Sequence, residues 1–109
     1  MLKGIILCAK HNVGESTDKE SGEVFSWDKV NLWVAVKSEN PREQRSLICG
    51  YGEPHEYGLK NDFNDRVIVG DTGVSCWNDL HMCEVELYFD DRNRLDCIKV
   101  VSLDGREQL

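Results

Sequence analysis

The segment from Glu23 to Lys37 carries the residue types best suited to binding chemistry. Along a β-strand, successive side chains point to opposite faces, so alternate residues share a face. One face of this segment is aliphatic, and the other combines aromatic rings with cations: Phe25, Trp27, Lys29, Trp33 and Lys37. Rings stack on nucleobases and cations attract phosphates, so this face has what single-stranded nucleic acid requires. The same rings could instead pack under a loop or in a dimer interface.

Basic residues near this segment extend the candidate site. Lys19 precedes the strand, and Arg42 and Arg45 follow it in a polar stretch. With Lys29 and Lys37 they are the predicted phosphate contacts. Tyr51 and Tyr57, on the next segment, are weaker candidates for stacking.

Neither a metal site nor an active site is predicted. Cys76, Asp79, His81 and Cys83 lie within eight residues, but no second Cys or His pair at zinc spacing accompanies them, so Cys83 is expected to be a core residue. The chain contains no GxSxG, HExxH or phosphate-loop motif, and its three histidines belong to no nucleophile motif. We therefore expect a protein that is not an enzyme and needs no cofactor.

Strand patterns dominate the elements that must position these residues. Apolar alternation or short apolar runs predict strands over residues 2–10, 23–37, 46–50, 83–89 and 95–103, and residues 67–69 are a brief apolar stretch. Polar turns at residues 17–22 and 90–93 predict two hairpins. Residues 38–44 are expected to form a loop, and residues 51–65 are irregular, either a loop or one helical turn. Together these features favour a single all-β domain over residues 1–109, a small five-stranded OB-like Greek-key barrel, with a β-sandwich fragment or an α+β domain as alternatives.

Composition limits the compartment and the partners. The chain has no apolar run long enough to span a membrane, and residues 1–9 lack a signal-peptide cleavage site. Its five cysteines are odd in number and mostly lie in apolar stretches, which favours buried, reduced thiols in a cytoplasmic protein. The net charge of −7 argues against strong nonspecific nucleic-acid binding. The acidic excess is concentrated in residues 61–109, however, which leaves room for a local basic track in the first half.

Two stretches resemble the filamentous-phage single-stranded DNA-binding proteins. SGEVFSWDKVNLWVAV is similar to the DNA-binding wing and following strand of that family: Gly22 stands at the hairpin tip, and Phe25 and Trp33 follow at the family's spacing. Leu32, Val34 and Val36 match its core face, and EVELYFDDRNRLDCIKVVSL is similar to its last hairpin. The resemblance implies a dimeric OB-type barrel that coats viral single strands during rolling-circle replication.

The sequence thus predicts a homodimeric single-stranded DNA-binding protein of phage or plasmid type that acts in DNA replication. The alternative is an acidic interaction protein, such as an immunity protein, an inhibitor or a DNA mimic. Its acidic C-terminal half would then meet a basic protein partner.

Overall fold

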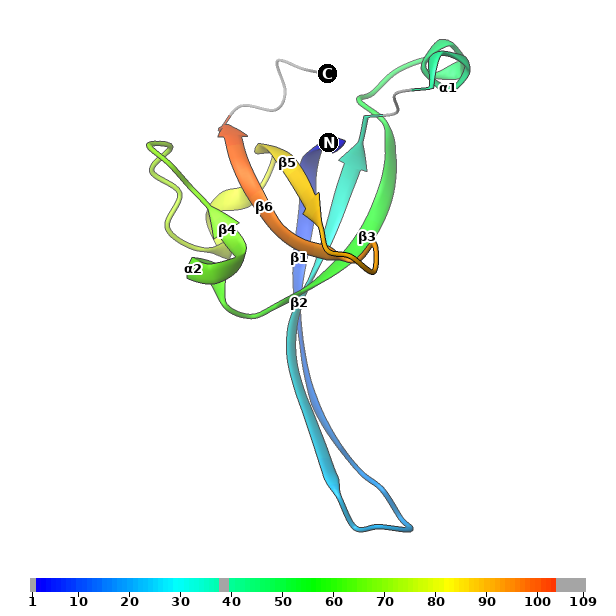
Figure 1. Cartoon of the computed structure of the whole chain (residues 1–109). Helices are drawn as coiled ribbons and strands as arrows, with labels where there is room; N and C mark the ends of the chain where they lie inside the picture. The colour runs from blue at the N-terminus through cyan, green and yellow to red at the C-terminus, as the bar shows by residue number, and fades with distance from the viewer. Residues whose placement is uncertain (1, 38–39, 104–109) are drawn as a thin grey trace.

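The computed structural model describes residues 2–37 and 40–103, and its architecture is one strongly curved, six-stranded sheet (Figure 1). The strand order is β3-β2-β1-β5-β6-β4, and only the β4–β6 pair is parallel. The strands are β1 (Leu2–Thr17), β2 (Val24–Val36), β3 (Glu53–Lys60), β4 (Val67–Ile68), β5 (Glu84–Phe89) and β6 (Leu95–Ser102).

The β1–β2 hairpin extends well beyond the rest of the sheet. β5 pairs with β1 only at Leu2–Ile5, and β3 pairs with β2 only from Lys29 to Val36. Residues 12–28 therefore form a two-stranded projection, here called the arm, which reaches away from the body of the molecule (Figure 1). At its tip, Asp18 Oδ1 accepts a hydrogen bond from the Glu20 backbone N–H, and Gly22 adopts the positive φ of 74° that favours glycine.

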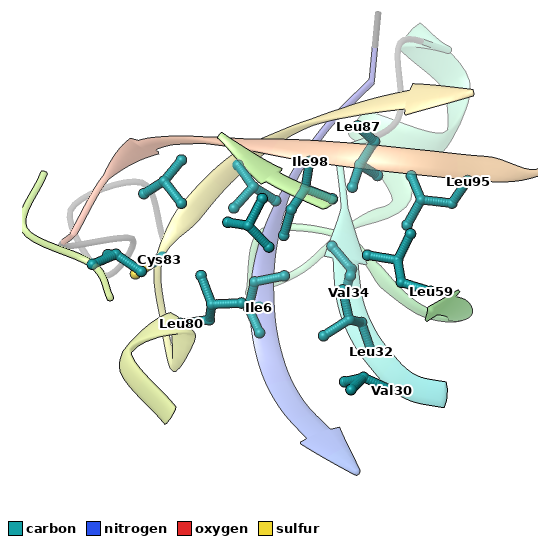
Figure 2. Close-up of a cluster of buried hydrophobic side chains, with 14 of the residues drawn as sticks. Ile6, Val30, Leu32, Val34, Leu59, Leu80, Cys83, Leu87, Leu95 and Ile98 are labelled. Atoms are coloured by element: carbon teal, nitrogen blue, oxygen red, sulfur yellow. The ribbon is translucent and has the colours of Figure 1, made fainter. Parts of the chain in front are cut away.

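The core lies inside the curve of the sheet. Val30, Leu32, Val34 and Val36, one face of β2, are all buried and pack with Ile6 of β1. Side chains from the other strands complete the cluster, as Figure 2 shows for Leu59, Leu80, Cys83, Leu87, Leu95 and Ile98. The predicted alternation of residues 23–37 is confirmed, because this aliphatic face supplies the core.

Within the described residues, three short helices complete the fold: α1 (Pro41–Ser46), α2 (Phe63–Arg66) and the 3₁₀ helix η1 (Trp77–Leu80). None of the helices in the described ranges is long and apolar enough to cross a membrane. Figure 1 places α1 at the end of the molecule opposite the arm tip, whereas α2 and η1 lie beside the sheet.

The all-β class is confirmed, but the closed five-stranded barrel is wrong, because the sheet has six strands and remains open. The predicted strand over residues 46–50 is also wrong, since helix α1 ends at Ser46 and no strand follows until Glu53. The missing strand is β3, within residues 51–65, which the sequence left as a loop or helical turn. Pro54 and Gly58 argue against a central strand, but β3 is an edge strand, where proline is tolerated.

The cysteines are free, as predicted, but three of the five are exposed rather than buried. All five cysteines are free thiols. Cys83 is buried and Cys97 half-buried, as expected, whereas Cys8, Cys49 and Cys76 are exposed. An apolar neighbourhood in sequence therefore does not bury a side chain in a loop or on the outer face of a hairpin.

The burial of Leu32 and the exposure of Ile48 predict different effects of alanine at these two positions. Leu32 is fully buried, so Leu32→Ala should lower the free energy of unfolding by about 2–5 kcal/mol. Ile48 is 99% exposed, so Ile48→Ala should change it by less than about 0.5 kcal/mol. Urea titration followed by circular dichroism measures both, and equal effects would contradict the core described here.

Candidate nucleic-acid interface

The register of the hairpin decides which residues accompany the rings of β2. Trp27 stands directly across from Gly14, and Phe25 from Ser16. Directly paired residues of an antiparallel pair share a face. The outer face of the hairpin, here called the aromatic face, therefore consists of Cys8, Lys10, Asn12, Gly14 and Ser16 of β1 with Phe25, Trp27, Lys29, Asn31 and Trp33 of β2.

Charges are separated between the two faces of the hairpin. The ten positions of the aromatic face include two lysines and no acidic residue. The acids of β1 and β2, Glu15 and Asp28, lie on the opposite face, across from Ser26 and Val13 respectively. In a chain with net charge −7, β1 and β2 thus contribute no carboxylate to this face, and the Glu56 carboxylate of β3 borders it at the body end.

Trp27 is held flat against the arm. A Cβ atom added to Gly14 would come within 2.2 Å of Trp27 Cζ2, so the indole can lie over this position only because it is glycine. Trp27 Nε1 donates a hydrogen bond to Asn12 Oδ1 at 3.1 Å, which fixes the ring in its plane. One ring face is thus covered by the partner strand, and the indole remains 38% exposed. This is a rigid platform for stacking.

Three lysines gather where the arm joins the body. Lys29 of β2 stands directly across from Lys60 of β3, and Lys10 of β1 is diagonal to Lys29 on the same face. None of the three has a carboxylate within ion-pair distance in the described part of the chain. Like charges placed directly opposite each other destabilise a sheet, so the Lys29–Lys60 pair adds no stability to the β2–β3 pairing.

The other predicted residues of β2 lie on or near this face. Phe25 is 54% exposed on the arm, beyond Trp27. Trp33 is half-buried on the body, across from Cys8 and from Glu56, whose Oε1 accepts a hydrogen bond from Asn31. Lys19 is exposed at the arm tip, between Asp18 and Glu20, and Lys37 is exposed just after β2 ends. The structure therefore brings Phe25, Trp27 and Lys29 together and leaves Lys19 and Lys37 at the two ends.

The remaining four candidates lie away from the arm. Arg42 and Arg45 belong to α1, at the opposite end of the molecule (Figure 1). Tyr51 is buried against Ile5 and Ala35, and this burial raises the pKa of its phenol. The half-buried ring of Tyr57 packs edge-on against Phe89, with centroids 5.9 Å apart. Neither tyrosine ring is therefore free to stack on a base.

The opposite face of the hairpin is tied to the body by a chain of polar contacts. His11 Nε2 lies 2.5 Å from Asp28 Oδ1, and Asn61 Nδ2 donates to the same carboxylate at 3.2 Å. Trp77 Nε1 in turn donates to Asn61 Oδ1 at 2.9 Å. The His11 hydrogen bond is the main reason that the pKa of Asp28 is below its usual value. These contacts anchor the root of the arm and so set its direction.

Sequence reasoning missed four residues of this surface: Lys10, Asn12, Gly14 and Lys60. Their roles follow from cross-strand register, which a bulge between Ile6 and Cys8 shifts by one residue. Lys60 was missed because β3 was not predicted. The one available signal was Gly14, since a glycine inside a strand often marks a close approach by another group.

Comparison of the chain with protein-family models, curated proteins and solved structures found no match. The described residues contain no group of three or more His, Cys, Asp or Glu side chains that could hold a metal ion.

The Trp27 platform predicts different effects of alanine at two glycines. Gly14→Ala should displace the indole and break the Trp27–Asn12 hydrogen bond, which shifts the indole N–H resonance of Trp27 and speeds its exchange with solvent. Gly58→Ala is the matched control, because a Cβ there meets nothing within 4 Å and φ is not positive. An unchanged Trp27 resonance in Gly14→Ala would contradict this packing.

The anchor predicts a pKa that depends on one partner. In His11→Ala the pKa of Asp28 should rise toward its usual value, because its largest stabilising hydrogen bond is removed. The stability that this pair contributes is present above the usual pKa of 3.8 and is lost as pH falls through the lowered value. NMR titration of the side-chain carboxyls measures the change. Asp18 is the internal control, since its pKa is lowered chiefly by the Glu20 backbone N–H and should not move.

Proposed function

We propose that this protein binds single-stranded DNA on the aromatic face of its arm. The observation that carries the proposal is the juxtaposition of the Trp27 platform with Lys10, Lys29 and Lys60, on a hairpin face to which β1 and β2 contribute no acidic residue. Bases would stack on Trp27 and Phe25, while the lysines at the arm root would contact the phosphates. Trp33 would extend the stacking surface onto the body.

Binding of this kind tolerates many sequences. Every base offers a π-face, and the aromatic face presents chiefly rings and cations rather than a set of groups matched to one base edge. A protein of this kind suits the coating of single strands during replication of a phage or plasmid, as the family resemblance of residues 19–37 implies. We propose that it does so as a homodimer in the cytoplasm, where its free thiols would stay reduced.

The contacts of two acidic residues, Asp90 and Asp96, favour this proposal over binding of a basic protein through the C-terminal half. Asp96 Oδ1 accepts a hydrogen bond from Arg66 at 2.7 Å. Asp90 Oδ1 accepts hydrogen bonds from the backbone N–H groups of Arg92 and Arg94, and Asp90 Oδ2 lies 3.5 Å from Arg94 Nε. These carboxylates already have partners within the chain, so a basic protein would have to compete for them.

The proposal predicts two separable effects on binding to oligo-dT. Trp27→Leu should cost about 1–3 kcal/mol and leave the salt dependence unchanged, because stacking is not ionic. Lys29→Met should reduce the slope of log K against log salt by about 0.7, the contribution of one phosphate contact on a single strand. Tryptophan fluorescence and the anisotropy of labelled oligo-dT report both effects. They are measured from about 20 to 200 mM salt, a range over which charge screening changes strongly.

Arg42→Met is the matched control for Lys29→Met, because Arg42 is exposed but lies on α1, far from the arm (Figure 1). Its affinity and salt slope should equal those of the unmodified protein. Absence of oligo-dT binding at the lowest salt by the folded protein would overturn the proposal. Equal losses from Lys29→Met and Arg42→Met would show that net charge, not the arm, governs binding.

A further inference from the structure

A cavity of about 420 Å³ lies at the root of the arm and adjoins the aromatic face, because Cys8 and Lys10 belong to both. Its walls come from β1, from Val30 of β2, from the turn after β3 and from η1. Val30 and its cross-strand partner His11 belong to the core-facing side of the hairpin, opposite Trp27 and Lys29. The volume falls within the range of about 300–1,000 Å³ that is typical of small-molecule sites.

One part of the wall is held in place before any ligand binds. His11, Asn61 and Trp77 all line the cavity. His11 and Asn61 are hydrogen-bonded to the Asp28 carboxylate, and Trp77 Nε1 donates to Asn61 Oδ1. Trp77 also packs edge-to-face against Phe63, with centroids 5.3 Å apart. An aromatic wall fixed in this way needs no rearrangement to contact a flat ligand, which lowers the entropic cost of binding.

Another part of the wall has hydrogen-bonding groups with no partner. In residues 2–37 and 40–103, no side-chain hydrogen bond or ion pair is found for Asn78, His81 or Lys10, all of which line the cavity. No acidic side chain lines it, although the chain has 20 Asp and Glu residues. The nearest carboxylate on this network, Asp28, is already bonded to His11 and Asn61. The cavity therefore offers donors and a cation to a ligand that brings negative charge.

We propose that this cavity is a second binding site, which takes a small ligand with a flat heteroaromatic ring and a phosphate, a nucleoside monophosphate. The ring would lie against Trp77 and Val30, with its polar edge toward Asn78. Lys10 and His81 would face the phosphate. The two sites share Lys10, but the inference does not depend on DNA binding by the arm, because Trp77, Asn78 and His81 lie outside the hairpin.

The test is a ¹H–¹⁵N NMR titration with three probes: dAMP, adenosine and inorganic phosphate. With dAMP we expect saturable shifts of the backbone amides of His11, Asn61 and Asn78 and of the Trp77 indole N–H. Adenosine and phosphate should each bind at least about tenfold more weakly, because each lacks one of the two recognised groups. No shift at these positions with dAMP would overturn the proposal. Equal affinity for dAMP and phosphate would also overturn it, because the cavity would then bind an anion only.

Two exposed residues allow matched variants that should fold normally. His81→Gln and Asn78→Leu should each weaken dAMP binding by about fivefold or more, the loss expected for one hydrogen bond. His55→Gln and Asn64→Leu, on exposed positions that do not line the cavity, should leave it unchanged. If all four variants bind alike, the site lies elsewhere and the proposal fails.

A variant of the arm separates this site from the proposed function. Trp27→Ala should weaken oligo-dT binding and leave the dAMP shifts at the cavity intact. Loss of oligo-dT binding alone would thus leave the cavity site standing, whereas loss of the dAMP shifts in Trp27→Ala would show that dAMP binds the aromatic face instead and would overturn the second site.

Discussion

The single extra residue in β1, at the bulge between Ile6 and Cys8, decides what the arm presents. Before the bulge Ile6 faces Val34, and after it Cys8 faces Trp33. A one-residue shift of register moves every following side chain of a strand to the other face. Without the bulge, Asn12 would stand across from Asp28 and Gly14 from Ser26, on the core-facing side. Glu15 and Val13 would then join the aromatic face. The Trp27 platform and the exclusion of carboxylates both follow from this one irregularity.

The length of the arm reconciles a net charge of −7 with a surface for an anion. Lys29 is the residue nearest the arm tip at which β2 still pairs with β3. Phe25 lies four residues closer to the tip, which corresponds to about 13 Å of extended strand. That distance exceeds the screening length of about 8 Å at physiological salt. Repulsion from the acidic body is therefore weak along the arm. Glu20 and Glu23 remain near the tip, so the favourable region is the stretch from Phe25 to the lysine cluster.

Apolar alternation in the sequence was enough to predict the strands that bury one face. It was not enough to predict elements, such as the edge strand β3, that depend on their position in the sheet. The alternation of residues 23–37 correctly identified Val30, Leu32, Val34 and Val36 as core, because burial of one face imposes period two. β3 was missed because Pro54 and Gly58 are acceptable only at an edge, and edge position is a property of the whole sheet. Of the candidate site, Phe25, Trp27 and Lys29 could be read from one strand. Gly14, Asn12 and Lys60 could not, because cross-strand partners depend on a bulge and on a strand that the sequence does not mark.

The length and the exposed apolar residues of the arm favour the proposal that it binds a ligand. A two-stranded hairpin is marginally stable in water, and this one leaves Val13, Val24 and Phe25 more than half exposed. Its polar contacts sit at the two ends: the turn closed by Asp18 at the tip, and the His11–Asp28–Asn61 contacts at the root. Between them, apart from the Trp27–Asn12 hydrogen bond, the side chains add little that would hold the hairpin together in isolation. Stability alone would favour a shorter hairpin with polar residues at these positions. The length of the arm, its exposed rings and the lysines that have no carboxylate partner among the described residues fit the proposed ligand, single-stranded DNA, which is extended and anionic and would cover the rings with its bases.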